Sequence, residues 1–346
     1  VSGRNYKFKS MSRTELKELG EFALIDHLTQ EVAIHHQETI LGIGDDAAVI
    51  ENKDICTLVS TDLLIEGIHF DLMYHPLKHL GYKAVIVNLS DILAMNAVPK
   101  QITVSVAVSN RFSVEALEQL YEGIRTACNL YKIDLVGGDT TASPKGLIIS
   151  VTVIGTQQKE KIVKRNGAKP GDYIYVTGYL GGAYLGLQLL EREKRIYQEH
   201  PDIQPQLGEN REILERILKP EARMDIIRIL DKNNILPSAM IDLSDGLSSD
   251  LLHICKQSGT GALIEEQNIP IQQEAQLMAL EFHLDPITCA LSGGEDYELL
   301  ICIPPDQHDK VKTLPSFYYI GEIIAPENGV RLKTTHGNYH NITAQG

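Results

Sequence analysis

The chain has 346 residues, 43% of them hydrophobic and 23% charged, which is long enough for two domains with apolar cores and ordinary for a globular protein. The formal net charge of -14 argues against broad electrostatic binding to nucleic acid or to anionic lipid, because both would repel an acidic surface.

No uninterrupted apolar run approaches the length of a membrane span, and the N-terminus shows no signal-peptide pattern, so we expect a cytoplasmic enzyme. The cysteines are odd in number and never form a CxxC pair, so we expect neither a disulfide framework nor a cysteine zinc site. They are Cys56, Cys128, Cys255, Cys289 and Cys302.

In chain order, the first predicted element is an amphipathic helix over residues 15–28, with Ser12 as its cap. Residues 40–155 then alternate between strand and helix patterns, which favours one α/β domain built on a mixed sheet. Its expected elements are strands over 55–60, 101–109, 134–136 and 147–155, and helices over 76–97 and 113–131.

A loop over residues 166–172 separates the two halves, and we expect domains over residues 11–157 and 158–346. The charged, poorly periodic stretch 191–210 is expected to be a surface excursion. In this half we predict strands over 173–177, 240–242, 287–291 and 299–303, one helix that ends at about residue 190 and another that runs through Cys255.

Carboxylates gather at the ends of several of these elements. Asp45 and Asp46 lie in a glycine-rich turn, and Asp62 closes the strand that begins at residue 55. Asp91 interrupts an otherwise apolar helix, where an unpaired carboxylate would be costly. Further carboxylates follow strand patterns, at Asp139, Asp242 and Asp245.

These side chains offer only hard oxygen ligands, and no histidine or cysteine lies at zinc-like spacing, so the ligand set predicts Mg²⁺. So many like charges would repel one another unless cations arrive with the substrate, which makes the site incomplete without metal. Paired glycines at 137–138 and 181–182 would let backbone N–H groups approach phosphate oxygens.

The chain contains neither a GxxxxGK[ST] phosphate loop nor the HRD and DFG motifs of protein kinases. A positioned catalytic base is also missing from the sequence pattern. An acceptor hydroxyl normally needs such a base, whereas an acceptor phosphate is already an anionic nucleophile. We therefore expect catalysis by positioning and charge neutralisation, without a general base.

Each of these residues also has a plainer explanation. A pair such as Asp45 and Asp46 commonly forms a turn or a helix cap. Taken alone, His69 would be a partly buried histidine, Arg165 a solvated loop charge and Tyr121 a core residue. A module that binds Ca²⁺ is a further alternative, although EF-hand spacing is absent. The recurrence of acidic turns favours the metal site.

Eight motifs follow one another over nearly the whole chain: Glu21-Phe22, Gly44-Asp45-Asp46-Ala47, Ser60-Thr61-Asp62, Gly67-Ile68-His69-Phe70, Asn88-Leu89-Ser90-Asp91, Gly138-Asp139-Thr140, Asp242-Leu243-Ser244-Asp245-Gly246-Leu247 and Ser292-Gly293-Gly294-Glu295-Asp296-Tyr297-Glu298-Leu299. As a set, they resemble the thiamine-monophosphate kinase family. The resemblance implies the two-domain α/β (α+β) fold of the aminoimidazole ribonucleotide synthetase-like superfamily. In that fold, an N-terminal mixed-sheet domain forms a dimer barrel and a C-terminal α+β domain completes the active site.

The resemblance also implies ATP-dependent phosphorylation of thiamine monophosphate to thiamine diphosphate by a homodimer, with several Mg²⁺ ions bridging the two substrates. The residues that match the family's metal shell are Asp45, Ser60, Thr61, Asp62, Asp91, Asp139, Asp242 and Asp245. Those that match nucleotide contacts are Tyr121, Gly138, Arg165 and Ser244, and those that match contacts to the thiamine moiety are His69 and Glu295.

One family feature has no direct counterpart in this sequence. The family usually ends with an aromatic residue, often Trp after Gly, that packs on the substrate, whereas this sequence contains no Trp. Tyr318, Tyr319 and Tyr339 are the alternatives for that role. The alternative functions are those of other superfamily members, namely selenophosphate synthetase, an amide-activating synthetase or the hydrogenase-maturation dehydratase.

Overall fold

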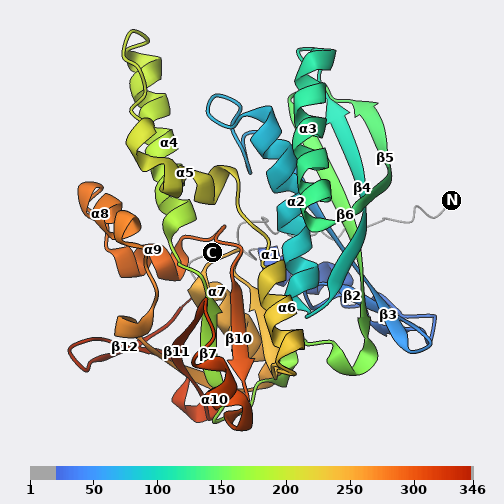
Figure 1. Cartoon of the computed structure of the whole chain (residues 1–346), viewed down its shortest axis with the longest axis vertical. Coiled ribbons are helices and arrows are strands. Elements are labelled where there is room, and N and C mark those ends of the chain that lie inside the picture. The colour runs from blue at the N-terminus through green and yellow to red at the C-terminus, as the bar shows by residue number, and fades with distance from the viewer. Residues whose placement is uncertain (1–20, 344–346) are drawn as a thin grey trace, which may run out of the picture. The chain divides into compact units, whose positions relative to one another are not determined.

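The computed structural model describes residues 21–343, and the chain divides into one unit of residues 1–37 with residue 346 and a second of residues 38–345. In the first unit, α1 (Glu21–Thr29) overlaps the helix predicted over residues 15–28; residues 15–20 and the Ser12 cap lie outside the described residues. The second unit contains two sheets and the helices packed on them (Figure 1).

The first sheet has six strands in the order β1-β2-β3-β6-β4-β5. Strands β4 and β5 are parallel and the other neighbours are antiparallel, so the predicted mixed sheet is confirmed. The strands are β1 (Thr39–Leu41), β2 (Ala48–Asn52), β3 (Ile55–Ile65), β4 (Val98–Val108), β5 (Asp134–Ala142) and β6 (Leu147–Gln158).

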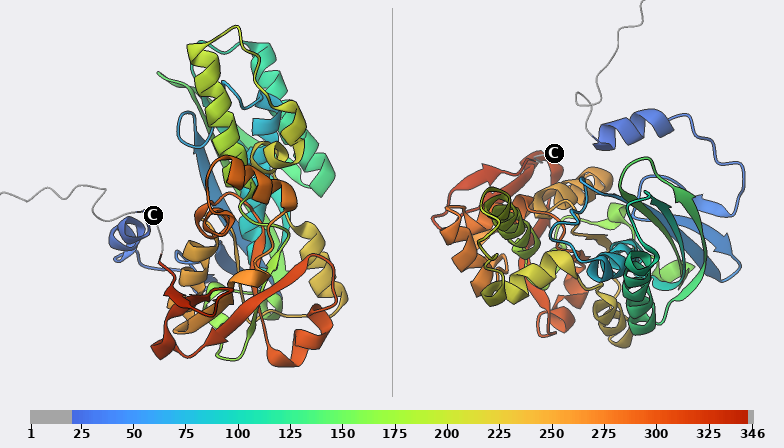
Figure 2. Two further views of the ribbon diagram at one scale, coloured as in Figure 1. Left: turned by 90° about the vertical axis from the view of Figure 1, so that its left-hand side faces the viewer. Right: turned by 90° about the horizontal axis from the view of Figure 1, so that it is seen from above.

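Helices α2 (Leu77–Ala94) and α3 (Val114–Tyr131) lie on one face of this sheet (Figure 2). Almost all of α2 is buried, as its apolar sequence requires. Two glycines let the helices approach closely: a Cβ on Gly81 would lie 1.9 Å from the Leu120 carbonyl oxygen, and one on Gly123 would lie 1.9 Å from that of Lys78. The glycine pair therefore fixes how α2 sits against α3.

The opposite face of the first sheet is more open. Burial alternates along β3, β4 and β6, as expected for strands with only one face in a core. On the open face, Leu63 of β3 is 49% exposed, and Val136 of β5 is 58% exposed. This face therefore presents apolar side chains to its surroundings.

The second sheet has seven strands in the order β13-β12-β9-β11-β7-β10-β8. Its strands are β7 (Tyr173–Thr177), β8 (Ala239–Asp242), β9 (Gly261–Glu265), β10 (Leu299–Ile303), β11 (Phe317–Ile324), β12 (Val330–Lys333) and β13 (Tyr339–Asn341). The helices of this half are α4 (Gly182–Glu199), α5 (Arg211–Leu218), α6 (Met224–Lys232), α7 (Leu247–Ser258), α8 (Gln273–Glu281), α9 (Pro286–Ser292) and α10 (His308–Val311).

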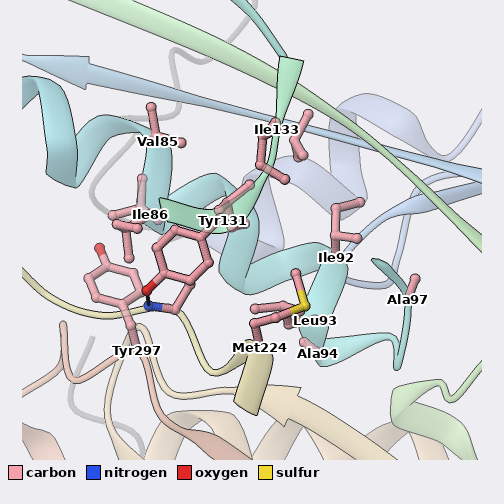
Figure 3. Close-up of a cluster of buried hydrophobic side chains, with 14 of the residues drawn as sticks. Val85, Ile86, Ile92, Leu93, Ala94, Ala97, Tyr131, Ile133, Met224 and Tyr297 are labelled. Carbon is pink, nitrogen blue, oxygen red and sulfur yellow. Dashed lines mark hydrogen bonds between the residues drawn. The ribbon is translucent and has the colours of Figure 1, made fainter. Parts of the chain in front are cut away.

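One hydrophobic core joins the two halves. Figure 3 shows Tyr131 of α3, Met224 of α6 and Tyr297 gathered around α2, where they meet Ile86 and Leu93. All five cysteines are buried and free, as expected. Within the described part of the chain, no helix combines the length and apolar character that crossing a bilayer requires.

Some sequence predictions of local structure are wrong. The stretch 287–291 was expected to be a strand, but it lies in α9. Five alternating residues are too few to separate the two periods, and Asp285 caps a helix there by accepting hydrogen bonds from the Ile287 and Thr288 amides at 3.4 and 3.0 Å. Similarly, the predicted end of the β5 strand at Val136 is too early. A Cβ on Gly138 would lie 1.8 Å from the Val104 carbonyl oxygen, so glycine lets β5 continue alongside β4.

The expected surface excursion over residues 191–210 is wrong in its first part, because α4 continues to Glu199. Its charged residues have partners on the loop between β3 and α2. Lys194 forms an ion pair with Asp71 at 2.7 Å, and Glu191 accepts a hydrogen bond from the Tyr74 hydroxyl at 2.8 Å. Glu191 and Lys194 therefore line a cavity, and the weak periodicity of the sequence gave no indication of this role.

Candidate active site

Three carboxylates converge where the two halves of the second unit meet. Oxygens of Asp46, Asp91 and Asp242 all lie within 4.8 Å of one another. Asp46 comes from the turn before β2, Asp91 from α2 and Asp242 from the end of β8, so both sheets contribute to this acidic cluster. Two of the three residues, Asp91 and Asp242, were predicted as metal ligands.

Neighbouring polar side chains hold these carboxylates in place. The Ser60 hydroxyl donates to Asp91 Oδ2 at 2.5 Å, and the Ser90 hydroxyl donates to Asp242 Oδ2 at 2.7 Å. Asn88 Oδ1 accepts the backbone N–H of Asp62 at 3.1 Å. The polar interruptions of the apolar helix α2 are thus satisfied by β3 and β8, the elements that carry the other site residues.

Burial and the neighbouring negative charges make the ionised form of these carboxylates costly. Burial, reinforced by the charges of Asp62, Asp242 and Asp46, raises the pKa of Asp91 well above its usual value. Burial and then Asp46 raise the pKa of Asp242 to about 7, although the Ser90 hydrogen bond opposes the shift. Burial and Asp46 likewise raise the pKa of Asp45 to about 6. A cation is the natural complement of such a site.

Arg165 borders the cluster and pairs with Asp46. Its Nε and Nη2 donate to the two carboxylate oxygens of Asp46 at 3.0 and 2.5 Å, which is a bidentate geometry. The Asp45 carboxylate instead accepts the backbone N–H groups of Asp46 and Arg165 at 3.0 and 3.3 Å. The turn therefore places Asp46 in the cluster and directs Asp45 to main-chain donors, whereas the sequence favoured Asp45.

Two loops at the ends of neighbouring strands β8 and β10 complete this region. The Glu295 N–H donates to the Ser244 carbonyl at 2.7 Å, and the Tyr297 N–H donates to that of Leu243 at 2.9 Å. Glu295 and Tyr297 have φ values of 57° and 50°, which are unusual for residues with side chains. Strained backbone of this kind commonly marks a functional site. Asp245 lies exposed in the first of these loops.

A cavity of about 400 Å³ lies beside these loops, and it contains both predicted thiamine contacts, His69 and Glu295. His69 Nδ1 accepts the Ile65 N–H at 3.0 Å, and Glu295 Oε1 lies 3.1 Å from the Lys83 ammonium. The complete lining is Gly67, Ile68, His69, Phe70, Asp71, Tyr74, His75, Lys83, Leu187, Glu191, Lys194, Ile217 and Glu295.

Other predicted site residues are not part of this arrangement. The Thr61 hydroxyl lies on the open face of β3, where it is 3.0 Å from the Thr152 hydroxyl. Gly138 and Asp139 are on β5, which β6 and β4 separate from β3 by about 14 Å at the usual strand spacing. Tyr121 packs against the core beside α2.

The three tyrosines considered as aromatic substrate contacts, Tyr318, Tyr319 and Tyr339, do not line the cavity among the described residues. Two further residues of this region, Lys83 and Asp250, were not predicted from the sequence. Lys83 lies within the apolar run of α2, and a lysine in that context could have indicated a buried functional cation. Asp250, whose carboxylate accepts the Gly246 N–H at 3.1 Å, followed an acidic turn and resembled an ordinary helix residue.

Known proteins share this architecture. Residues 44–157 match the family model for the N-terminal domain of AIR synthase related proteins, and residues 169–333 match the model for the C-terminal domain. The thiamine-monophosphate kinase of Aquifex aeolicus (strain VF5) is 36% identical over 292 residues, covering 84% of this chain and 88% of the relative. That of Bacillus subtilis (strain 168) is 35% identical over 295 residues, covering 85% and 86%.

Solved structures agree with these relatives. A structure of AaThiL complexed with AMPPCP and TMP superposes with a TM-score of 0.80 at 33% identity, covering 93% of this chain and 96% of that one. The two ranges matched by the family models, residues 44–157 and 169–333, contain the three residues of the acidic cluster. The chain therefore belongs to the thiamine-monophosphate kinase family, within the AIR synthase related proteins.

Proposed function

We propose that this protein transfers the γ-phosphate of ATP to the phosphate of thiamine monophosphate, giving thiamine diphosphate and ADP. The observation that carries the proposal is the acidic cluster of Asp46, Asp91 and Asp242 beside the cavity that contains His69 and Glu295. The related AaThiL structure was solved with AMPPCP and TMP, which supports the same pair of substrates here.

The donor set of the cluster fits Mg²⁺. It offers carboxylate and hydroxyl oxygens, which this ion prefers, from Asp46, Asp91, Asp242 and Ser60. When bound, Mg²⁺ would offset the charge of the phosphates during transfer. The predicted shell also includes Asp45, Asp62 and Asp245, together with Thr61 and Asp139, which lie outside the acidic cluster in the single chain.

The residues of the chain position the reactants without removing a proton. The acceptor phosphate is already anionic, so it attacks without a general base. Arg165 offers a charged fork beside the cluster, and nucleotide phosphate would compete with Asp46 for that fork. The other predicted nucleotide contacts are Tyr121, Gly138 and Ser244.

The cavity suits the cationic organic part of the substrate. Its lining has three carboxylates, Asp71, Glu191 and Glu295, against two ammonium groups, Lys83 and Lys194. The excess of one negative charge complements a thiazolium ring. Apolar walls and a few convergent polar groups are typical of small-molecule sites.

A homodimer, with residues 11–157 and 158–346 as domains of each protomer, belongs to the same proposal. The open face of the first sheet supports it, because Leu63 and Val136 are exposed apolar residues there. Sedimentation velocity should give twice the mass of the chain for the wild type, and Leu63→Lys should shift the protein toward the monomer. A wild-type monomer at micromolar concentration would refute this part of the proposal.

The function is tested by incubating the purified protein with ATP, Mg²⁺ and thiamine monophosphate. Chromatography should show thiamine diphosphate and ADP in equal amounts, and omission of Mg²⁺ should abolish both. Formation of AMP and orthophosphate would instead indicate a dikinase. Turnover of formylglycinamidine ribonucleotide or of selenide would indicate one of the related synthetases.

A further inference from the structure

A further cavity, of about 510 Å³, lies where β3 and β4 begin, where β6 and α3 end, and along one side of α6. We call it the basic cavity. Its lining shares no residue with the acidic cluster or with the cavity that contains His69 and Glu295. A volume of this size is typical of a small-molecule site. The basic cavity is therefore large enough for a ligand of its own.

The lining of the basic cavity is positively charged, although the chain as a whole has a net charge of -14. It includes four cationic side chains, Lys100, Lys132, Lys161 and Arg228, and a single carboxylate, Asp231. Asp231 forms an ion pair with Lys161 at 2.8 Å. The other three cations have no ion-pair partner among the described residues. This excess of positive charge attracts anions to a chain that otherwise repels them.

The same cavity has an apolar wall. Met224 and Ile227 are 6% and 3% exposed, and they share one side of α6 with Arg228 and Asp231, because the four residues follow helical spacing. Tyr131, at the end of α3, adds a buried aromatic ring. Arg228 and Asp231 are exposed, so this side of α6 places apolar atoms inside and charge at the rim. Such a lining suits an anion that also contains a ring.

Lys132 has a backbone conformation that favours glycine. It follows the last residue of α3 with φ 61° and ψ 48°, and its N–H donates to the Cys128 carbonyl. Glycine usually takes this left-handed conformation at the end of a helix, because a residue with a Cβ is strained there. Asn96, which also lines the basic cavity, has a φ of 55°. A lysine at position 132 thus places a charge at the rim at some cost in stability.

We propose that the basic cavity binds an organic diphosphate, that is, a ring attached to a diphosphate group, at a site separate from the active site. Lys100, Lys132 and Arg228 bind the diphosphate, and the planar guanidinium of Arg228 can hold two of its oxygens. The ring packs against Met224 and Ile227. A nucleoside diphosphate and thiamine diphosphate share this chemistry. The inference goes beyond the proposed function and does not depend on it.

The test measures binding in EDTA at pH 8 and low ionic strength, without Mg²⁺. Under these conditions the acidic cluster repels phosphate, whereas the basic cavity supplies its own cations. Calorimetric titration of the wild type with ADP, and separately with thiamine diphosphate, should show one equivalent bound per chain for at least one of them. The ligand that binds more tightly identifies the source of the diphosphate. Absence of binding for both ligands would overturn the proposal.

Charge reversal at the rim places the ligand in the basic cavity. The double variant of Lys132→Glu and Arg228→Glu should weaken the affinity for the tighter ligand by at least about 100-fold, because each lost contact with a charged group costs about 10-fold or more. The matched control is the double variant of Arg125→Glu and Lys310→Glu, two exposed residues outside the lining, and it should bind as the wild type does. Equal losses in the two double variants would indicate general electrostatic attraction and would contradict a site.

Lys132→Gly separates binding from folding. Because glycine adopts the left-handed conformation without strain, the melting temperature of this variant without ligand should not fall below that of the wild type. Its affinity for the ligand should nevertheless fall by about 10-fold, since the ammonium group is gone. Wild-type affinity in Lys132→Gly would contradict the proposal. These measurements need neither metal nor turnover, so a failure of the proposed kinase activity would leave their outcome unchanged.

Discussion

At the scale of single residues, the acidic cluster is a set of carboxylates that the fold brings together at the expense of its own stability. Asp91 sits on a helix whose other residues are mostly buried and apolar, and its hydrogen bond from Ser60 offsets only part of the repulsion. Such an arrangement is retained when the charge is needed for function. Replacing one of these carboxylates by a neutral residue should therefore lower activity and raise the stability of the metal-free protein.

We expect Asp91→Asn to lower kcat for thiamine monophosphate by at least about 100-fold, because it removes one of the three carboxylates of the cluster. The metal-free variant should melt at a higher temperature than the metal-free wild type, since repulsion by Asp62 and Asp242 disappears. Steady-state kinetics and scanning calorimetry measure the two effects. Asp54→Asn, at an exposed position, should change neither.

The sequence located Asp91 and Asp242 correctly within the cluster, since a carboxylate in an apolar helix or directly after a buried strand has few other uses. It favoured Asp45, whereas the structure places Asp46 in the cluster. That choice depends on the turn, which bonds Asp45 to two main-chain amides. Lys83 was missed because a lysine in a helix is ordinarily a surface residue.

At the scale of elements, the close crossing of α2 and α3 positions the site. Gly81 and Gly123 occupy the contact, and each faces a carbonyl oxygen of the other helix. Because α2 carries Lys83 and Asp91, its distance from α3 and its rotation about its own axis set where both groups point. In the proposed function, we therefore expect these two glycines to affect ligand binding although they lie in the contact between α2 and α3.

Gly123→Ala should destabilise the protein by about 1–3 kcal/mol, the usual cost of overpacking a core, and should also raise KM for thiamine monophosphate. The added methyl would lie 1.9 Å from the Lys78 carbonyl oxygen, so the two backbones must separate. Urea titration and kinetics give the two quantities. The control is Gly208→Ala, because a Cβ at Gly208 meets nothing within 4 Å. A fully stable and active Gly123→Ala would contradict this account.

The elements that sequence patterns predicted best are those with long, clear periodicity, such as α2, α3 and β6. The wrong predictions lie in segments whose secondary structure depends on tertiary contacts. Strand β5 continues through two glycines because β4 lies alongside, and α4 extends beyond residue 190 because Lys194 and Glu191 find partners across the cavity. Local propensity carries no information on such partners.

At the scale of the whole molecule, an acidic chain holds three carboxylates, Asp46, Asp91 and Asp242, close together between elements of its two halves. Asp45 and Asp242 have pKa values raised to about 6 and 7 by burial and by Asp46. A carboxylate whose pKa is higher in the folded than in the unfolded state stabilises the fold when it is protonated. That contribution is complete below about pH 4, the usual pKa of Asp, and is lost as pH rises through these values.

The melting temperature of the metal-free protein should therefore fall between about pH 4 and pH 7 and then level off, as far as this cluster determines it. Mg²⁺ should restore stability at pH 8 and have less effect at pH 5, where protons compete for the same oxygens. Differential scanning fluorimetry across pH with and without Mg²⁺ measures both trends. Asp91→Asn should flatten them, and an unchanged Mg²⁺ response in that variant would count against the cluster as the metal site.

The arrangement of polar groups along α2 also bears on how enzymes of this kind can diversify. Lys83 faces the cavity two turns before Asp91 joins the acidic cluster. In the proposed function, contact with the organic part of the acceptor and phosphate chemistry would thus belong to separate stretches of one helix. A lineage, or a protein engineer, could alter residues 75–83 to admit a different ring system while residues 88–91 keep the machinery of transfer intact.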